Sequence, residues 1–147
     1  MFGAAMYNAI PTLDVLRKRG MQIVNRCWCC KRREETISHL FVHCDMASEI
    51  WRYFLQPYKL DWVFADNLQI ELWRWRENFG SRSGRKIWQP LPFAIVWGIW
   101  LERNNRAFNE KENSMDEVIR NIKSLIYLWG TAKEIFEGYV VEDLVLR

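Results

Sequence analysis

The sequence lacks the features that would place it in a membrane or outside the cell. Its most apolar run, Pro92–Leu101, spans ten residues, half of the roughly 20 that a membrane-spanning helix needs. Residues 1–10 contain no basic region, and Tyr7 and Asn8 interrupt their apolar side chains, so we expect no secretory signal. Only four of the 147 residues are cysteine. We therefore expect an intracellular protein, nuclear or cytoplasmic and without membrane contact, whose cysteines bind metal or remain thiols.

Hydrophobic residues, in contrast, are abundant. They make up 50% of the chain, and nine residues are tryptophan. A chain of this size and composition can form one ordinary domain, or one small metal-binding module followed by a helical unit. We find no internal repeat and no long low-complexity tract.

Positive charge is concentrated near the N-terminus, although the net charge is only +3. Before residue 34 the only acidic residue is Asp14, and the basic residues are Arg17, Lys18, Arg19, Arg26, Lys31, Arg32 and Arg33. Such a stripe suits contact with phosphate groups. It would also be expected of an ordinary solvated face, and both interpretations stay open.

Four residues within eighteen positions form a C-x2-C-x8-H-x4-C series: Cys27, Cys30, His39 and Cys44. Proteins bind zinc tetrahedrally with such ligands, supplied as two closely spaced pairs. A two-residue gap lets the first two sulfurs turn toward one point, and the gap of four before Cys44 suits a second pair. We predict one structural Zn²⁺ bound by these four residues.

Two further residues offer alternative ligands. Cys29 cannot replace Cys30 without destroying the C-x2-C spacing, so we interpret it as a spare thiol beside the site. His43 lies one helical turn after His39 and could bind instead. We prefer His39, because His43 and Cys44 are adjacent and would have to reach the same ion.

The apolar spacing and the turn residues predict a mainly α fold. Helices are expected over residues 12–19, from 36 to just before Cys44, over 45–55, 66–79 and 92–109, and from 114 to about 129. Residues 1–60 would form a small zinc-stapled helical module. Residues 61–147 would form a tryptophan-rich helical unit, with a flexible stretch near 80–86.

Two of these helices carry sharper expectations. His39 and Cys44 would lie about 140° apart on an ideal helix, so the helix must distort or end for both to reach one ion. On the helix over 92–109, one face holds Phe93, Trp97, Trp100, Leu101 and Phe108. Asn104 lies near the centre of that face, so we expect it to be buried and hydrogen-bonded to the backbone of a neighbouring segment.

The order of these residues resembles a known family. Cys27-x2-Cys30, then Glu35-Thr36-x2-His39-Leu40-Phe41-x2-Cys44, then Ile50-Trp51 is similar to the zinc-binding domain that follows the reverse transcriptase of plant LINE-type (non-LTR) retrotransposons. The later Trp97-x2-Trp100-x2-Arg103-Asn104-x3-Phe108 is similar to a helical segment that commonly follows this domain in plant retroelement-derived proteins.

The resemblance implies a C-terminal fragment of a retroelement polyprotein, or a protein derived from one. It implies zinc bound by the four ligands and contact with RNA or DNA beside a reverse transcriptase encoded upstream. We find no Tyr-x-Asp-Asp polymerase motif and no recognisable ribonuclease H pattern, so we expect no catalytic activity. The candidate nucleic-acid residues surround the first ligand pair: Arg26, Trp28, Lys31, Arg32 and Arg33.

Other functions compete with this one. Trp28 could stack on bases, or it could simply cover the metal. Exposure of Trp73, Trp75 or Trp88 would instead favour a protein-interaction module in which zinc only holds the fold. Thiol redox chemistry at Cys27 and Cys30 is disfavoured, because a His/Cys pair follows at ligand spacing.

Overall fold

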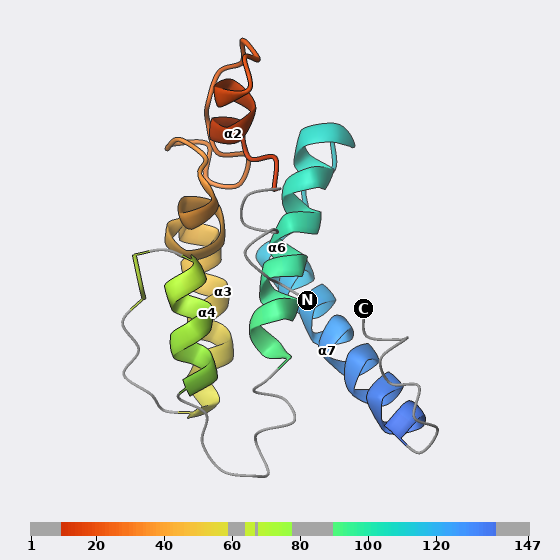
Figure 1. The fold of residues 1–147 in the computed structure, drawn as a ribbon. Coiled ribbons are helices and arrows are strands. Elements are labelled where there is room, and N and C mark those ends of the chain that lie inside the picture. Colours follow the sequence, from red (N-terminus) through yellow and green to blue (C-terminus); the bar gives the residue numbers. More distant parts are fainter. Residues whose placement is uncertain (1–9, 59–63, 67, 78–89, 138–147) are drawn as a thin grey trace.

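A computed structural model describes residues 10–58, 64–66, 68–77 and 90–137 of the chain. These residues form helices joined by turns and loops, with no strand among them, which confirms the predicted mainly α fold. Figure 1 shows α3 and α4 side by side, with α6 between them and α7. One end of α6 points toward the loops around α2.

The first helix, α2 (Leu13–Lys18), is short, with Arg19 as its C-cap and a turn at Gly20. Thr12 occupies the N-cap position, as predicted, but its side chain makes no capping hydrogen bond. The Leu13 amide instead donates to Glu35 Oε1 at 3.0 Å. Gly20 has a φ of 95°, the left-handed conformation that glycine adopts at little cost. Residues 21–27 then run without helix or strand toward the first ligand pair.

His39 begins a π-helical turn, η1 (His39–His43), and Cys44 follows it as the cap between η1 and α3 (Asp45–Leu55). A 3₁₀ turn, η2 (Gln56–Tyr58), comes after α3. Thr36 Oγ1 accepts the His39 amide at 3.0 Å, which confirms Thr36 as the cap. The α3 bounds match those predicted from the sequence. Its apolar stripe is buried, as expected, and consists of Ile50, Trp51, Phe54 and Leu55.

Helix α4 (Leu68–Glu77) packs on this segment through a pair of tryptophans. The rings of Trp51 and Trp75 lie 5.3 Å apart between centroids, and both side chains are buried. Trp51 Nε1 also donates to the Phe41 carbonyl at 2.6 Å. Trp73 points the other way and is 62% exposed. Of the three tryptophans considered for a surface patch, one is therefore exposed, one is buried, and Trp88 lies outside the described residues.

The C-terminal pair of helices, α6 (Leu91–Phe108) and α7 (Met115–Glu137), pack closely against each other. A Cβ on Gly98 would lie 2.4 Å from Cγ1 of Ile122, so glycine permits this approach. Ser114 caps α7 by accepting the Glu117 amide at 3.3 Å, as the sequence predicted. The helix continues to Glu137, beyond the end expected near residue 129.

The prediction of which face of α6 is buried is wrong. Trp97, Leu101 and Phe108 are 39%, 42% and 74% exposed. The buried side contains Leu91, Pro92, Ala94, Ile95, Val96, Gly98, Ile99, Glu102 and Arg103. Asn104 is only half-buried and accepts a hydrogen bond from the Arg103 side chain at 3.2 Å, not from backbone. The helix packs on η1 and α3 on one side and on α7 on the other, and these partners select the face.

One hydrophobic core runs from Ile10 to Ile122 and includes residues from both proposed halves of the chain. The domain boundary near residue 60 stays a prediction, and the linker expected near 80–86 lies outside the described residues. Within the described parts of the chain, no helix combines the length and apolar character that crossing a membrane would require.

Candidate metal centre

The first ligand pair lies on a tight turn closed by its own backbone. The Cys27 amide donates to the Arg33 carbonyl at 2.7 Å, and the Lys31 amide donates to the Cys27 carbonyl at 2.9 Å. Lys31 adopts a left-handed φ of 61°, which is uncommon for a residue other than glycine. The turn folds the chain back after Cys30, so both cysteines of the C-x2-C pair face the same side as His39 and Cys44.

The second pair depends on the π turn. The Cys44 amide donates to the His39 carbonyl at 2.6 Å, a five-residue hydrogen bond in place of the usual four-residue one. This wider turn brings side chains five positions apart toward one face. The expected helix distortion before Cys44 is confirmed, and it takes the form of one π turn. Leu40, Phe41 and Val42, which lie between the ligands, are fully buried and anchor the turn in the core.

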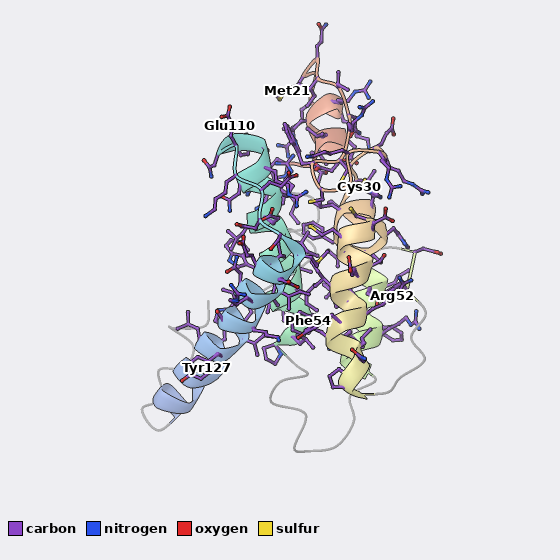
Figure 2. All side chains as sticks on the ribbon, turned by 180° about the vertical axis from the view of Figure 1, so that it is seen from behind. Met21, Cys30, Arg52, Phe54, Glu110 and Tyr127 are labelled. Carbon is purple, nitrogen blue, oxygen red and sulfur yellow. The ribbon has the colours of Figure 1, made fainter. Side chains whose placement is uncertain are left out.

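The four ligand atoms converge on one point. The three Sγ atoms and one ring nitrogen of His39 all lie within 4.8 Å of one another. Cys27 Sγ lies 3.9 Å from Cys44 Sγ, and Cys30 Sγ lies 3.3 Å from His39 Nε2. Tetrahedral zinc with Zn–S bonds of about 2.3 Å separates sulfurs by about 3.7 Å. Figure 2 shows the labelled Cys30 where sulfur atoms gather, between α2 and the start of the η1–α3 segment.

The chemistry of the donor set also fits zinc. Cys27 and Cys44 are 1% and 0% exposed, so water cannot solvate a thiolate there. Hydrogen bonding with the Cys29 and Cys44 thiols lowers the pKa of Cys27, whereas hydrogen bonding with Cys27 and burial raise the pKa of Cys44. Hydrogen bonding with Cys27 also raises the pKa of His39. Thiols that compete for protons in this way are suited to a divalent cation, which stabilises several thiolates at once.

Cys27, Cys30, His39 and Cys44 therefore form a zinc site with four protein ligands, as the sequence predicted. A site closed by four protein ligands leaves no position for a reactive water, and its role is to hold the fold.

Neither of the two alternative ligands belongs to the metal site, as expected. Cys29 does not join the cluster; its amide donates to Cys27 Sγ at 3.4 Å, so it lies beside the site. His43 is exposed, and its Nε2 lies 3.0 Å from the Asp66 carbonyl oxygen. The preference for His39 over His43 is confirmed.

A buried ion pair behind the site was not expected from the sequence. Glu35 Oε1 and Oε2 accept from Arg103 Nη2 and Nε at 2.8 and 3.2 Å, and the two side chains are 0% and 2% exposed. The backbone of Glu35 is also held in place, because Asn25 Oδ1 accepts the Glu35 amide at 2.8 Å. The sequence signal was the presence of Glu35 and Arg103 in the two motifs that carry the family resemblance, but nothing in either motif pairs them.

The candidate nucleic-acid residues are all exposed on the turn and its flanks. Lys31 forms an ion pair with Glu112 at 2.7 Å, and Arg32 forms one with Asp45. Arg26 and Arg33 make no ion pair with any described residue. The Trp28 side chain is 37% exposed. These five side chains are therefore open to solvent near the zinc site.

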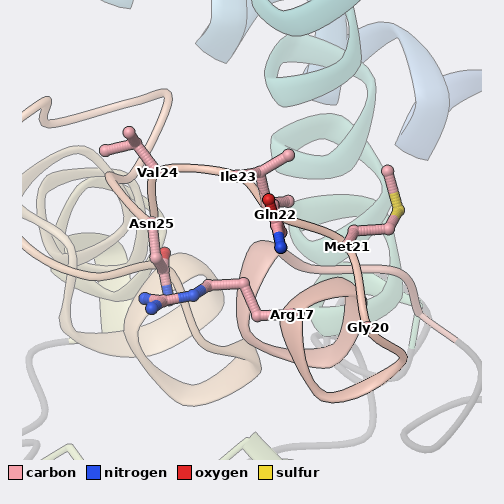
Figure 3. Close-up of a pocket in the computed structure, with 7 residues that line it drawn as sticks. All are labelled: Arg17, Gly20, Met21, Gln22, Ile23, Val24 and Asn25. Carbon is pink, nitrogen blue, oxygen red and sulfur yellow. The ribbon is translucent and has the colours of Figure 1, made fainter.

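A shallow surface hollow of about 740 Å³ lies between α2 and the segment that follows it. Figure 3 shows Arg17 reaching across it toward Asn25, with Met21 and Val24 at its rim. Val24 is 82% exposed. Arg17, which lines the hollow, is a further cation in addition to the basic residues Arg26, Lys31, Arg32 and Arg33.

Comparison with known proteins agrees with this site. Residues 2–51 match the family model described as zinc-binding in reverse transcriptase. The matched segment contains all four ligands and ends within α3. It covers a zinc-binding region of the reverse-transcriptase type and no catalytic domain. No curated protein and no solved structure matches the chain.

Proposed function

We propose that this chain is a non-catalytic zinc module of plant LINE-type (non-LTR) retroelement origin that contacts RNA or DNA beside a reverse transcriptase encoded upstream. The observation that supports it most is the shape of the C-x2-C turn. A metal that fixes this turn would hold its cations and Trp28 in a constant arrangement. Fixed cations and an exposed ring can bind the phosphates and bases of a flexible single strand of RNA or DNA. We expect this binding in the nucleus or cytoplasm.

The charges around the turn support phosphate contact. Arg26 and Arg33 are exposed and unpaired among the described residues. The partners of Lys31 and Arg32 are weak competitors, because the side chains in both pairs are between 49% and 70% exposed. Surface ion pairs of this kind contribute about 0–1 kcal/mol, so a phosphate can displace them. Trp28 adds an exposed ring on which a base can stack.

Binding of a fluorescent single-stranded RNA or DNA to the zinc-loaded protein tests the proposal. Affinity should fall steeply as salt rises, with little sequence preference, because bound phosphates release counterions. Arg26→Glu/Arg33→Glu should weaken binding and flatten the dependence of log K on log salt by at least about 0.7 per lost phosphate contact. Arg120→Glu, which reverses an exposed charge on α7, is the matched control and should have a much smaller effect.

A second candidate function is a zinc-stabilised protein-interaction module with no nucleic-acid role. The exposed aromatic side chains favour it: Trp73, Phe108 and Tyr127 are 62%, 74% and 76% exposed, and exposed aromatics are common at interfaces. Zinc-loaded protein that binds no nucleic acid at low salt would exclude the first proposal and favour this one.

A further inference from the structure

Arg106 on α6 reaches the zinc turn from outside the segment that matches the zinc-binding family. Its Nη1 donates to the Cys29 carbonyl at 3.0 Å and, more weakly, to the Trp28 carbonyl at 3.5 Å. These carbonyls belong to the two residues between the ligands Cys27 and Cys30. The Arg106 side chain is 12% exposed, so it lies under the turn, largely out of solvent. Figure 1 shows that the same end of α6 approaches the loops near α2.

The guanidinium group is itself held from behind. Arg106 Nε donates to Glu102 Oε2 at 2.7 Å, and the Glu102 side chain is 2% exposed. Glu102 also accepts from the amide and side chain of Asn113, at 3.0 and 2.9 Å. Arg106 therefore has a fixed position set by α6 and by the loop before α7. The planar guanidinium group has several donors in a fixed fork, so Nε and Nη2 can donate to Glu102 and Asn113 while Nη1 donates to the turn.

A second connection joins the same turn to the loop before α7. Glu112 Oε1 lies 3.1 Å from Arg106 Nη1 and 2.7 Å from Lys31 Nζ. The pKa of Glu112 is lowered by the hydrogen bond with Lys31 and by the charge of Arg106. The C-x2-C turn is thus held at its centre by Arg106, and the exposed Lys31–Glu112 pair at its end adds little to this contact.

Arg106 acts on the metal site through the turn that it holds, because its own charge is already paired with Glu102 and Glu112. Groups outside the ligand shell that orient ligands in this way commonly change metal affinity by about 10- to 100-fold when removed.

We propose that Arg106 is a positioning residue of the zinc site: it holds the Cys27–Cys30 turn in its metal-binding shape. The zinc-binding unit therefore includes the end of α6, more than 50 positions after the last residue of the family match at residue 51. This inference rests on the zinc site and not on nucleic-acid contact, so either can fail without the other.

The rate of zinc loss from the full chain to an excess of a chromophoric chelator tests the inference. Arg106→Ala should release zinc about 10- to 100-fold faster than the unchanged protein. Arg106→Lys, which keeps the charge but loses the fork, should give an intermediate rate. Arg120→Ala, on the exposed face of α7, should release zinc at the original rate.

A purely structural role for Arg106 predicts something else. In that case Arg106→Ala would lower the stability of zinc-loaded and zinc-free protein equally. Arg106→Ala leaves the buried Glu102 carboxylate without its cation in either background, so part of the loss is common to both. The total loss should still be larger in the zinc-loaded protein than in a Cys44→Ser background, where the turn binds no metal. Equal losses in both backgrounds, or an unchanged zinc release rate in folded Arg106→Ala, would overturn the inference. If the alanine variant does not fold, the release rate of Arg106→Lys decides in the same way.

Discussion

Glu35 and Arg103 form a buried two-contact ion pair across 68 positions of sequence, with Arg103 Nη2 and Nε at 2.8 and 3.2 Å from the carboxylate. Glu35 directly precedes the cap of the second ligand segment, and its Oε1 also accepts the amide of Leu13. Arg103 stacks near Trp100, with its guanidinium carbon 5.1 Å from the ring centroid. This pair therefore joins α2, the ligand segment and α6 at one buried point.

Removing one partner of this pair should be costly. Arg103→Ala leaves the Glu35 carboxylate buried without its cation, and such losses cost about 3–5 kcal/mol. We expect a fall of that size in the free energy of unfolding, measured by urea denaturation of zinc-loaded protein. The double variant Glu35→Gln/Arg103→Met should be more stable than Arg103→Ala, because it buries no unpaired charge. A double variant as unstable as the single one would show that packing, not charge, explains the loss.

Loss of one ligand should release the metal. Cys44→Ser removes one buried sulfur from the site, and native mass spectrometry should find the protein without zinc. The segment from Met21 to Cys44 should lose protection from hydrogen exchange, because zinc holds both of its ligand pairs. The helices α6 and α7 should keep most of their structure. Cys29→Ser is the matched control: it changes a neighbouring thiol that is not a ligand and should retain one zinc. Zinc loss from the control would mean that Cys29 belongs to the site.

Two tryptophans on α4 should respond in opposite ways. Trp75 is 1% exposed and packs on Trp51, whereas Trp73 is 62% exposed. Trp75→Ala should cost about 3–5 kcal/mol of unfolding free energy. Trp73→Ala should change it by no more than about 0.5 kcal/mol. Urea denaturation of both variants checks this, and similar losses would contradict the orientation of α4.

The close approach of α6 and α7 should not tolerate a methyl group at Gly98. A Cβ there would meet Cγ1 and Cδ1 of Ile122 at 2.4 and 3.0 Å, and overpacking of this kind costs about 1–3 kcal/mol. That cost should outweigh the up to about 1 kcal/mol that alanine gains over glycine within a helix. Gly98→Ala/Ile122→Ala should be less destabilised than the sum of the two single variants, because the second change makes room for the first. Thermal or urea unfolding of the three variants measures this coupling.

Short-range signals in the sequence determined the zinc ligands and several helix bounds. Cys27 and Cys30 lie on one turn, and His39 and Cys44 lie on another, so spacing alone brings the members of each pair together. The cap at Thr36, the turn at Gly20 and the bounds of α3 also depend on residues within one or two helical turns. Local chain geometry decides such features, which is why the sequence could predict them.

Only the tertiary structure decided which face of α6 is buried and what holds the zinc turn from behind. The first half of α6 is apolar on most sides, so its periodicity does not select a face; contact with η1, α3 and α7 does. Arg103 and Arg106 look like surface residues in the sequence. They are largely buried because Glu35, Glu102 and the Cys29 carbonyl accept their hydrogen bonds. A buried charge is stable only where partners surround it, and folding brought two of these partners from more than 60 positions away.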